Sequence, residues 1–170
     1  MPTAVDYRTL PFGVTAIGDS GKYLGRSAYW RLYVTENLVR VLVHSVLSAQ
    51  IGPTWWAIAV DPAINQKIER MKRDHSRQPR HSSPGAHNIY YLFLSDMPKI
   101  ILANSHLFRP IMPDIDQWVL RIEDVRLPRN IVGHMNWLNT LDEQLIDALY
   151  SDLRTLIRKL ARSGISITIP

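Results

Sequence analysis

Leucine recurs every three or four residues between residues 141 and 160, and this stripe constrains the fold more than any other sequence feature. Its members are Leu141, Leu145, Leu149, Leu153, Leu156 and Leu160. The spacing follows the 3.6-residue period of an α-helix, whereas a strand would alternate every two residues. Acidic residues lie near the start of the segment and basic residues near its end, which complements the helix dipole. We therefore predict a long amphipathic closing helix whose apolar face needs other helices to cover it.

Two helices are predicted in the first half of the chain. An almost wholly apolar helix is expected over 35–50, and Gly52 and Pro53 end it. A helix that is apolar on nearly every side lies at the centre of a bundle or in an interface. The second helix is expected over 54–73, with a break before Pro62.

The second half of the chain adds two helices before the closing one. The first is expected over 95–104, and the second begins at Asp114 and is kinked or restarted by Pro128. Its buried face is marked by Ile115, Trp118, Ile122 and Val125. Trp55 and Trp56 are expected in the core, as most tryptophans beside a helix are.

These helices predict an all-α fold, an up-and-down bundle of four to five helices, because no repeat and no alternation of strands with helices is present. Residues 1–28 are rich in glycine and proline and show no helical stripe, so an irregular N-terminal arm is expected there. The helical domain is expected over 29–164. Residues 165–170 form a C-terminal tail whose composition would suit a short strand.

The composition narrows the classes of function. Cysteine is absent, which excludes disulfides, thiolate metal sites and cysteine nucleophiles and suits a reducing cytoplasm. No apolar run approaches the roughly 18 residues of a membrane span, and the N-terminus lacks a signal-peptide pattern. We therefore expect a cytoplasmic protein that makes no membrane contact. The formal charge of +5 favours nucleic acid or another polyanion as partner, with a plain solubility charge as the alternative.

The octapeptide AIGDSGKY at 16–23 superficially matches two catalytic motifs. A phosphate-binding loop would need glycine in place of Ala16 and serine or threonine in place of Tyr23. A serine esterase would need a later Asp-x-x-His block, and no aspartate in the chain has a histidine three residues on. A glycine-rich turn is therefore expected.

A polar, turn-rich loop is expected over 72–87, and it is long enough to suggest a function. Its histidines, His75, His81 and His87, are six residues apart, which matches neither a helical pair nor a zinc spacing. We therefore expect no metal and no other cofactor. The loop also carries a group of cations that suits contact with RNA phosphates, with an ordinary solvated loop as the alternative. These cations are Lys72, Arg73, Arg77 and Arg80.

The strongest candidate for chemistry is the segment LPRNIVGHMNW at 127–137. Asn130 lies four residues from both Arg126 and His134, so these pairs are neighbours on a helix, while Arg129 points about 140° away from His134. An arginine that holds a phosphate, an amide that orients it and a histidine that moves a proton suit phosphodiester chemistry. The alternative is a structural Arg–Asn–His cluster at a helix–helix contact.

The run Arg129-Asn130-x-x-x-His134, on a late helix followed by an amphipathic closing helix, resembles the HEPN superfamily of helical domains first linked to nucleotide binding. The turn IGPTWW at 51–56 and the segment DMPKIILANSHLF at 96–108 are similar to the Swt-type HEPN subgroup. The resemblance covers about residues 35–160.

The resemblance implies a HEPN-like bundle that pairs as a homodimer, with two motifs forming one metal-independent RNase site. Arg129 would bind the scissile phosphate, Asn130 would orient it, and His134 would be the acid–base residue. RNA would be the substrate of a toxin or anti-phage effector, held in check by an antitoxin or defence-system partner. Since some HEPN domains have lost catalysis, one alternative is a silent module that binds RNA, a nucleotide or a protein. Another is the helical subunit of a nucleotidyl-transfer pair.

Overall fold

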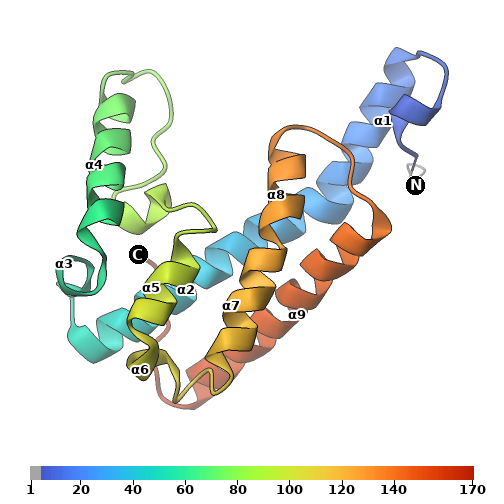
Figure 1. Cartoon of the computed structure of the whole chain (residues 1–170). Coiled ribbons are helices and arrows are strands. Elements are labelled where there is room, and N and C mark those ends of the chain that lie inside the picture. Colours follow the sequence, from blue (N-terminus) through green and yellow to red (C-terminus); the bar gives the residue numbers. More distant parts are fainter. Residues whose placement is uncertain (1–4) are drawn as a thin grey trace.

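The computed structural model describes residues 5–170, and within them the chain is an all-α bundle without a strand (Figure 1). The elements are η1 (Tyr7–Thr9), α1 (Val14–Leu24), the π-helical turn η2 (Gly25–Tyr29), α2 (Trp30–Ile51), α3 (Trp55–Ala59), α4 (Pro62–Ser76), η3 (Asn88–Tyr91), α5 (Met97–Ala103), α6 (Ser105–Phe108), α7 (Ile115–Asp124), α8 (Arg126–Gly133) and α9 (Thr140–Arg162). None of these helices combines the length and apolar character that crossing a bilayer demands. The all-α prediction is therefore confirmed, although several predicted helices are divided into two.

The prediction of an irregular N-terminal arm over 1–28 is wrong from Val14 onward. Helices α1, η2 and α2 follow one another without a break, and the α1 end of this long helix projects beyond the bundle (Figure 1). The expected glycine-rich turn at 16–23 lies inside α1. The first four residues of the expected arm lie outside the described residues.

Tertiary contacts account for the helix at this glycine-rich segment, because they offset the low helix propensity of glycine. The buried Ser20 hydroxyl donates to the Val5 carbonyl at 2.8 Å and accepts from the Tyr7 N–H at 3.1 Å. One turn later, the Tyr23 ring stacks on Trp137 with ring centroids 5.2 Å apart. The sequence pattern of the segment contains neither contact.

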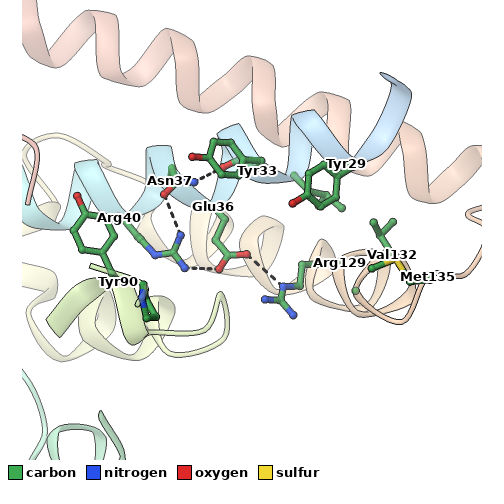
Figure 2. Close-up of a pocket in the computed structure, with 12 residues that line it drawn as sticks. Tyr29, Tyr33, Glu36, Asn37, Arg40, Tyr90, Arg129, Val132 and Met135 are labelled. Carbon is green, nitrogen blue, oxygen red and sulfur yellow. Dashed lines mark hydrogen bonds and ion pairs between the residues drawn. The ribbon is translucent and has the colours of Figure 1, made fainter. Parts of the chain in front are cut away.

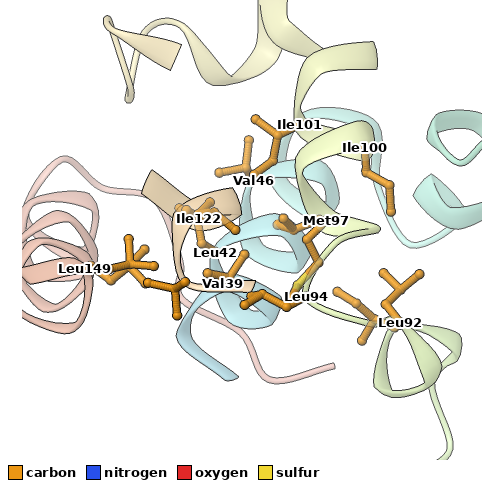
Figure 3. Close-up of a cluster of buried hydrophobic side chains, with 14 of the residues drawn as sticks. Val39, Leu42, Val46, Leu92, Leu94, Met97, Ile100, Ile101, Ile122 and Leu149 are labelled. Carbon is orange, nitrogen blue, oxygen red and sulfur yellow. The ribbon is translucent and has the colours of Figure 1, made fainter. Parts of the chain in front are cut away.

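Helix α2 lies at the centre of the bundle, against α9 on one side and α3, α5 and α6 on others. Figure 3 shows its side chains Val39, Leu42 and Val46 within the cluster of buried hydrophobic residues. Several of its apolar side chains have no exposed surface: Val39, Leu42, Val43, Val46 and Leu47. The expectation for a helix that is apolar all round is therefore met by a central position. Because one chain covers these side chains, they offer no argument for a dimer.

The second predicted helix breaks where expected, into α3 and α4. The Asp61 carboxylate caps α4 by accepting the Ala63 N–H at 2.7 Å, and Pro62 takes the first helical position, where no donor is needed. Helix α4 continues to Ser76, so Lys72 and Arg73 lie on a helix. The two residues fell in both the predicted helix and the predicted loop, and the loop in fact begins only after Ser76.

The closing helix α9 begins with a capping box between Asn139 and Asp142. The predicted leucine stripe is buried from Leu149 onward. Leu141 is exposed, and Ile146 begins the buried face instead. The predicted face of α7 is also confirmed, with Ile115, Ile122 and Val125 buried and Trp118 half-buried.

The C-terminal tail forms no strand. It runs back over α2, where the Thr168 N–H donates to the Ser45 hydroxyl at 3.0 Å, and the Pro170 carbonyl accepts the Tyr90 hydroxyl at 3.0 Å. A strand needs the backbone of a second strand for its hydrogen-bond ladder, and the tail lies against helices.

Candidate functional site between α2 and α8

Helix α8 carries the predicted motif, and its first turn explains how Pro128 is accommodated. Helix α7 ends at Asp124, and Pro128 is the third residue of α8, where a backbone N–H would have no partner within the helix. The Arg129 N–H already donates to the Val125 carbonyl at 3.0 Å. Pro128 thus restarts the helix, and Arg129 and Asn130 stand on regular helical backbone, with His134 as the C-cap residue.

The other end of α8 exposes His134. Its backbone N–H donates to the Asn130 carbonyl at 3.0 Å, and Met135 follows in the left-handed region with φ 59°. The Met135 and Asn136 N–H groups close the helix on the Val132 and Ile131 carbonyls, which is a Schellman motif. A left-handed conformation is uncommon for a residue other than glycine, and Met135 is also 83% exposed. The motif histidine is therefore held at a tightly closed, solvent-facing helix end.

Arg129 crosses from α8 to α2. Its Nε donates to Oε2 of Glu36 at 3.3 Å, and 35% of its side chain is exposed. Its NH1 group also lies 3.6 Å from the position that a Cβ atom on Gly133 would take. The remaining guanidinium donors make no hydrogen bond within residues 5–170. The arginine is thus anchored through one donor and presents the others.

Glu36 is the centre of a charged network on α2 (Figure 2). Its Oε1 accepts from NH2 of Arg40 at 2.5 Å, and both side chains are nearly buried, with 14% and 12% exposed. Arg40 also donates to Oδ1 of Asn37 at 3.1 Å and to the Leu92 carbonyl at 3.1 Å. Since Arg40 neutralises much of the Glu36 charge, the carboxylate is a fixed acceptor that positions Arg129.

A groove of about 500 Å³ runs between α2 and α8 beside this network. That volume is within the range of small-molecule sites. Its walls are Tyr29, Leu32, Tyr33, Glu36, Asn37, Arg40, Pro84, Tyr90, Arg129, Val132, Gly133 and Met135. Gly85 shapes one wall, because a Cβ atom there would lie 2.5 Å from the Tyr90 ring. Only glycine therefore allows this approach of the loop.

A second hollow, of about 260 Å³, joins three of the predicted site residues. Arg126, Arg129 and Asn130 line it together with Phe93, Leu94 and Ser95. Arg126 pairs with Glu123 of α7 at 3.2 Å. His134 is a wall of neither hollow. The structure thus gathers the two arginines and the asparagine, and it leaves the histidine at the end of α8.

The predicted RNA-contacting cations lie at the far end of α4, which Figure 1 shows well separated from α8. Lys72 donates to Oδ1 of Asn88 at 2.8 Å, and Arg77 lies 3.4 Å from Asp74. Arg73 and Arg80 are exposed and make no ion pair among the described residues. Lys72 and Arg73 share a hollow of about 530 Å³ with His75 and His81.

His87 separates from the other two loop histidines and enters an aromatic cluster. Its ring stacks on Trp55 at 5.4 Å and meets the edge of His44 at 5.1 Å. The Trp55 indole N–H donates to Nδ1 of His44 at 3.2 Å. Burial lowers the pKa of His44, and burial followed by the charges of His44 and Lys72 lowers the pKa of His87. Trp55 is thus a core residue, as predicted, and it anchors the end of the loop.

Sequence reasoning missed the α2 side of the groove. The signal was present as polar residues inside an otherwise apolar helix: Glu36, Asn37 and Arg40 stand on one face, with Glu36 and Arg40 four residues apart. The sequence pattern did not predict a groove role for Tyr29 and Tyr33, because Tyr29 directly follows the expected irregular arm.

Comparisons of the chain with protein-family models, with curated proteins and with solved structures found no match. Within residues 5–170, no group of three or more histidine, aspartate or glutamate side chains is placed to hold a metal ion. No family is therefore assigned, and the HEPN resemblance stays a hypothesis that the geometry of α2 and α8 must support.

Proposed function

We propose that this protein is a metal-independent endoribonuclease of HEPN type that acts through a composite site in a homodimer. The observation that carries the proposal is the hydrogen bonding of Arg129. Its Nε–H donates to Glu36, and its remaining N–H donors are available to an anion. Arginine suits this role because its planar group matches the geometry of a phosphate. Asn130 and Arg126 line the same hollow, so a phosphate there would meet two cations and an amide.

The exposed ring of His134 supports its role as the proton-transfer residue. It makes no hydrogen bond within the described residues and stands at the end of the helix that carries Arg129. In the proposed reaction the 2′-hydroxyl of RNA attacks the adjacent phosphorus, and one His134 accepts its proton. The bond from phosphorus to the 5′ oxygen breaks, and a second His134 protonates the leaving oxygen. The products are a 2′,3′-cyclic phosphate and a 5′-hydroxyl end.

A second copy of the chain is part of the proposal because Arg129 and His134 of one α8 do not line the same hollow. A two-fold axis at the end of α8 would place His134 of one copy beside Arg129 of the other. The exposed apolar side chain of Met135 supports contact at this end of α8. The role as a cytoplasmic toxin or anti-phage effector with a neutralising partner rests on the resemblance.

The ion pair between Arg129 and Glu36 favours a second candidate, a catalytically silent module that binds RNA, a nucleotide or a protein. A carboxylate 3.3 Å from Nε lowers the attraction of this arginine for a phosphate. Such a module would use the same groove and cations for binding, but it would not cleave RNA.

The deciding experiment incubates the purified protein with total RNA in EDTA, beside His134→Ala and Arg129→Ala proteins. We expect cleavage by the wild type alone, 2′,3′-cyclic phosphate ends, and no cut where a single 2′-deoxy nucleotide replaces the attacking one. Cleavage that requires magnesium, or that His134→Ala carries out at the wild-type rate, would overturn the proposal. RNA binding without cleavage would support the silent module. Sedimentation at micromolar protein tests the dimer.

A further inference from the structure

Three tyrosines along the groove have no aromatic partner. Tyr23, Tyr91 and Tyr150 each pack on a tryptophan or histidine ring, but no ring or cation is paired with Tyr29, Tyr33 or Tyr90 within the described residues. The partner rings of the first three tyrosines are Trp137, His75 and Trp30, and the other three belong to the groove wall. Tyr29, Tyr33 and Tyr90 all line the groove of about 500 Å³, whereas Tyr7, the other tyrosine without a ring partner among residues 5–170, lies outside it.

Tyr29, the last residue of η2, and Tyr33 on α2 are one turn apart, with 57% and 64% of their surface exposed. Exposure to this degree, in two aromatic residues that face one groove, leaves large apolar ring surfaces in water. Tyr90 is fixed instead, since its hydroxyl donates to the Pro170 carbonyl and its ring packs on Gly85. The groove thus has two accessible rings and one rigid wall.

The charges of the groove favour an anion close to these rings. Arg40 and Arg129 line it with Glu36 as the single carboxylate, so the charged walls sum to one positive charge. Arg40 is held in the Glu36 network, whereas the free donors of Arg129 lie at the boundary between the groove and the hollow of Arg126 and Asn130. A ligand with a flat ring and an attached phosphate matches this arrangement.

We infer that the groove is a nucleobase subsite for single-stranded RNA, in which Tyr29 and Tyr33 stack on the base that adjoins the phosphate at Arg129. The inference rests on the proposed function, which supplies the phosphate at Arg129, and it deepens that function by assigning the base. Every nucleobase has a π-face, so stacking would accept the four bases with modest preference. The substrate is therefore an unpaired segment, because a base within a duplex is already stacked on its neighbours.

The test measures binding, so that it does not depend on cleavage. A short fluorescein-labelled single-stranded RNA is titrated with His134→Ala protein by fluorescence anisotropy, and Tyr29→Ala and Tyr33→Ala are added to this background. We expect each substitution to weaken binding by about 5- to 150-fold, the range of one lost base–aromatic stack. Tyr33→Phe keeps the ring and should bind as before. Phe12→Ala is the matched control, because Phe12 is exposed and lies outside the groove.

A second arm separates stacking from charge. The affinities of RNAs that each carry one abasic position, and therefore keep the same charge, are measured for the His134→Ala protein and for the His134→Ala, Tyr33→Ala protein. At one position the missing base should weaken binding to the His134→Ala protein, and it should weaken binding less once Tyr33 is also alanine, because only Tyr29 then remains to stack on the base. Equal abasic effects on both proteins, or wild-type affinity of both tyrosine variants, would overturn the inference. Displacement of the RNA by an equal concentration of a nucleoside monophosphate would overturn the assignment to a strand.

The outcomes for the base subsite and for the nuclease are distinguishable. Coupling between the abasic position and Tyr33, in a protein that never cuts RNA, would leave the base subsite in place and refute the cleavage reaction. Cleavage that depends on His134, without such coupling, would support the nuclease and refute the base subsite. Thermal unfolding of each variant checks that its fold is intact.

Discussion

Replacing Glu36 with glutamine tests whether the charged network on α2 holds the groove together. The substitution keeps the shape of the side chain and removes the charge that Arg40 contacts at 2.5 Å and Arg129 at 3.3 Å. A hydrogen bond to a charged group contributes about 1.5–3 kcal/mol when shielded from water. The Arg129 contact is longer and more exposed, so it adds little.

The expected loss is therefore about 2 kcal/mol, most of it from Arg40. For a chain of this length, each kcal/mol lowers the melting midpoint by about 2–4 °C, so a decrease of about 4–8 °C is expected. Circular dichroism during heating and urea titration at neutral pH would measure it. Arg40→Ala should destabilise more than Arg129→Ala, because Arg40 also bonds Asn37 and the Leu92 carbonyl.

Glu69→Gln is the matched control. Glu69 lies 3.9 Å from Lys72, and the two side chains are 45% and 36% exposed, so this long and partly solvated pair contributes little to stability. Melting midpoints of Glu36→Gln and Glu69→Gln that agree to within about 1 °C would refute the network as a source of stability.

Three further predictions follow from the site and the loop. His134→Ala should slow RNA cleavage by about 100-fold or more in a gel assay, with an unchanged melting midpoint because the ring is exposed; a lowered midpoint would contradict a solvent-facing site. Because burial lowers the pKa of His44 and His87 in the folded chain, the unfolded chain binds their protons at higher pH, and stability should fall as pH drops below about 6.5. His87→Phe should flatten this acid slope in melts across pH, and an unchanged slope would refute the assignment. Gly85→Ala should cost about 1–3 kcal/mol in urea unfolding, since its Cβ would overlap the Tyr90 ring; wild-type stability would show that the ring moves freely.

The sequence predicted the polar residues of α8 because they interrupt a local helical pattern. Arg126, Asn130 and His134 appear as i,i+4 neighbours in one short segment, and a helix places such neighbours on one face. Glu36 was out of reach of this reasoning, because it is 93 residues from Arg129 in the chain. Contact across that separation depends on how α2 and α8 pack, and periodicity carries no information about it.

The N-terminal segment illustrates the opposite error. Its glycines favour turns by local propensity, which predicts an irregular arm over residues 1–28. The buried hydroxyl of Ser20 and the stack of Tyr23 on Trp137 supply tertiary contacts that exceed the preference, so the helix continues. Local propensity is a weak term wherever a segment gains packing.

What the sequence determined by itself was the all-α class, the closing helix and the break before Pro62, because hydrophobic period and proline geometry act within one segment. The tertiary structure alone decided that α2 lies at the centre of the bundle and not in an interface, that Tyr29 and Tyr33 line a groove with Arg129, and that His87 joins His44 and Trp55. Each of these depends on which surfaces of distant segments meet. A side chain's type fixes whether it favours burial, and only the packing of helices fixes what it is buried against.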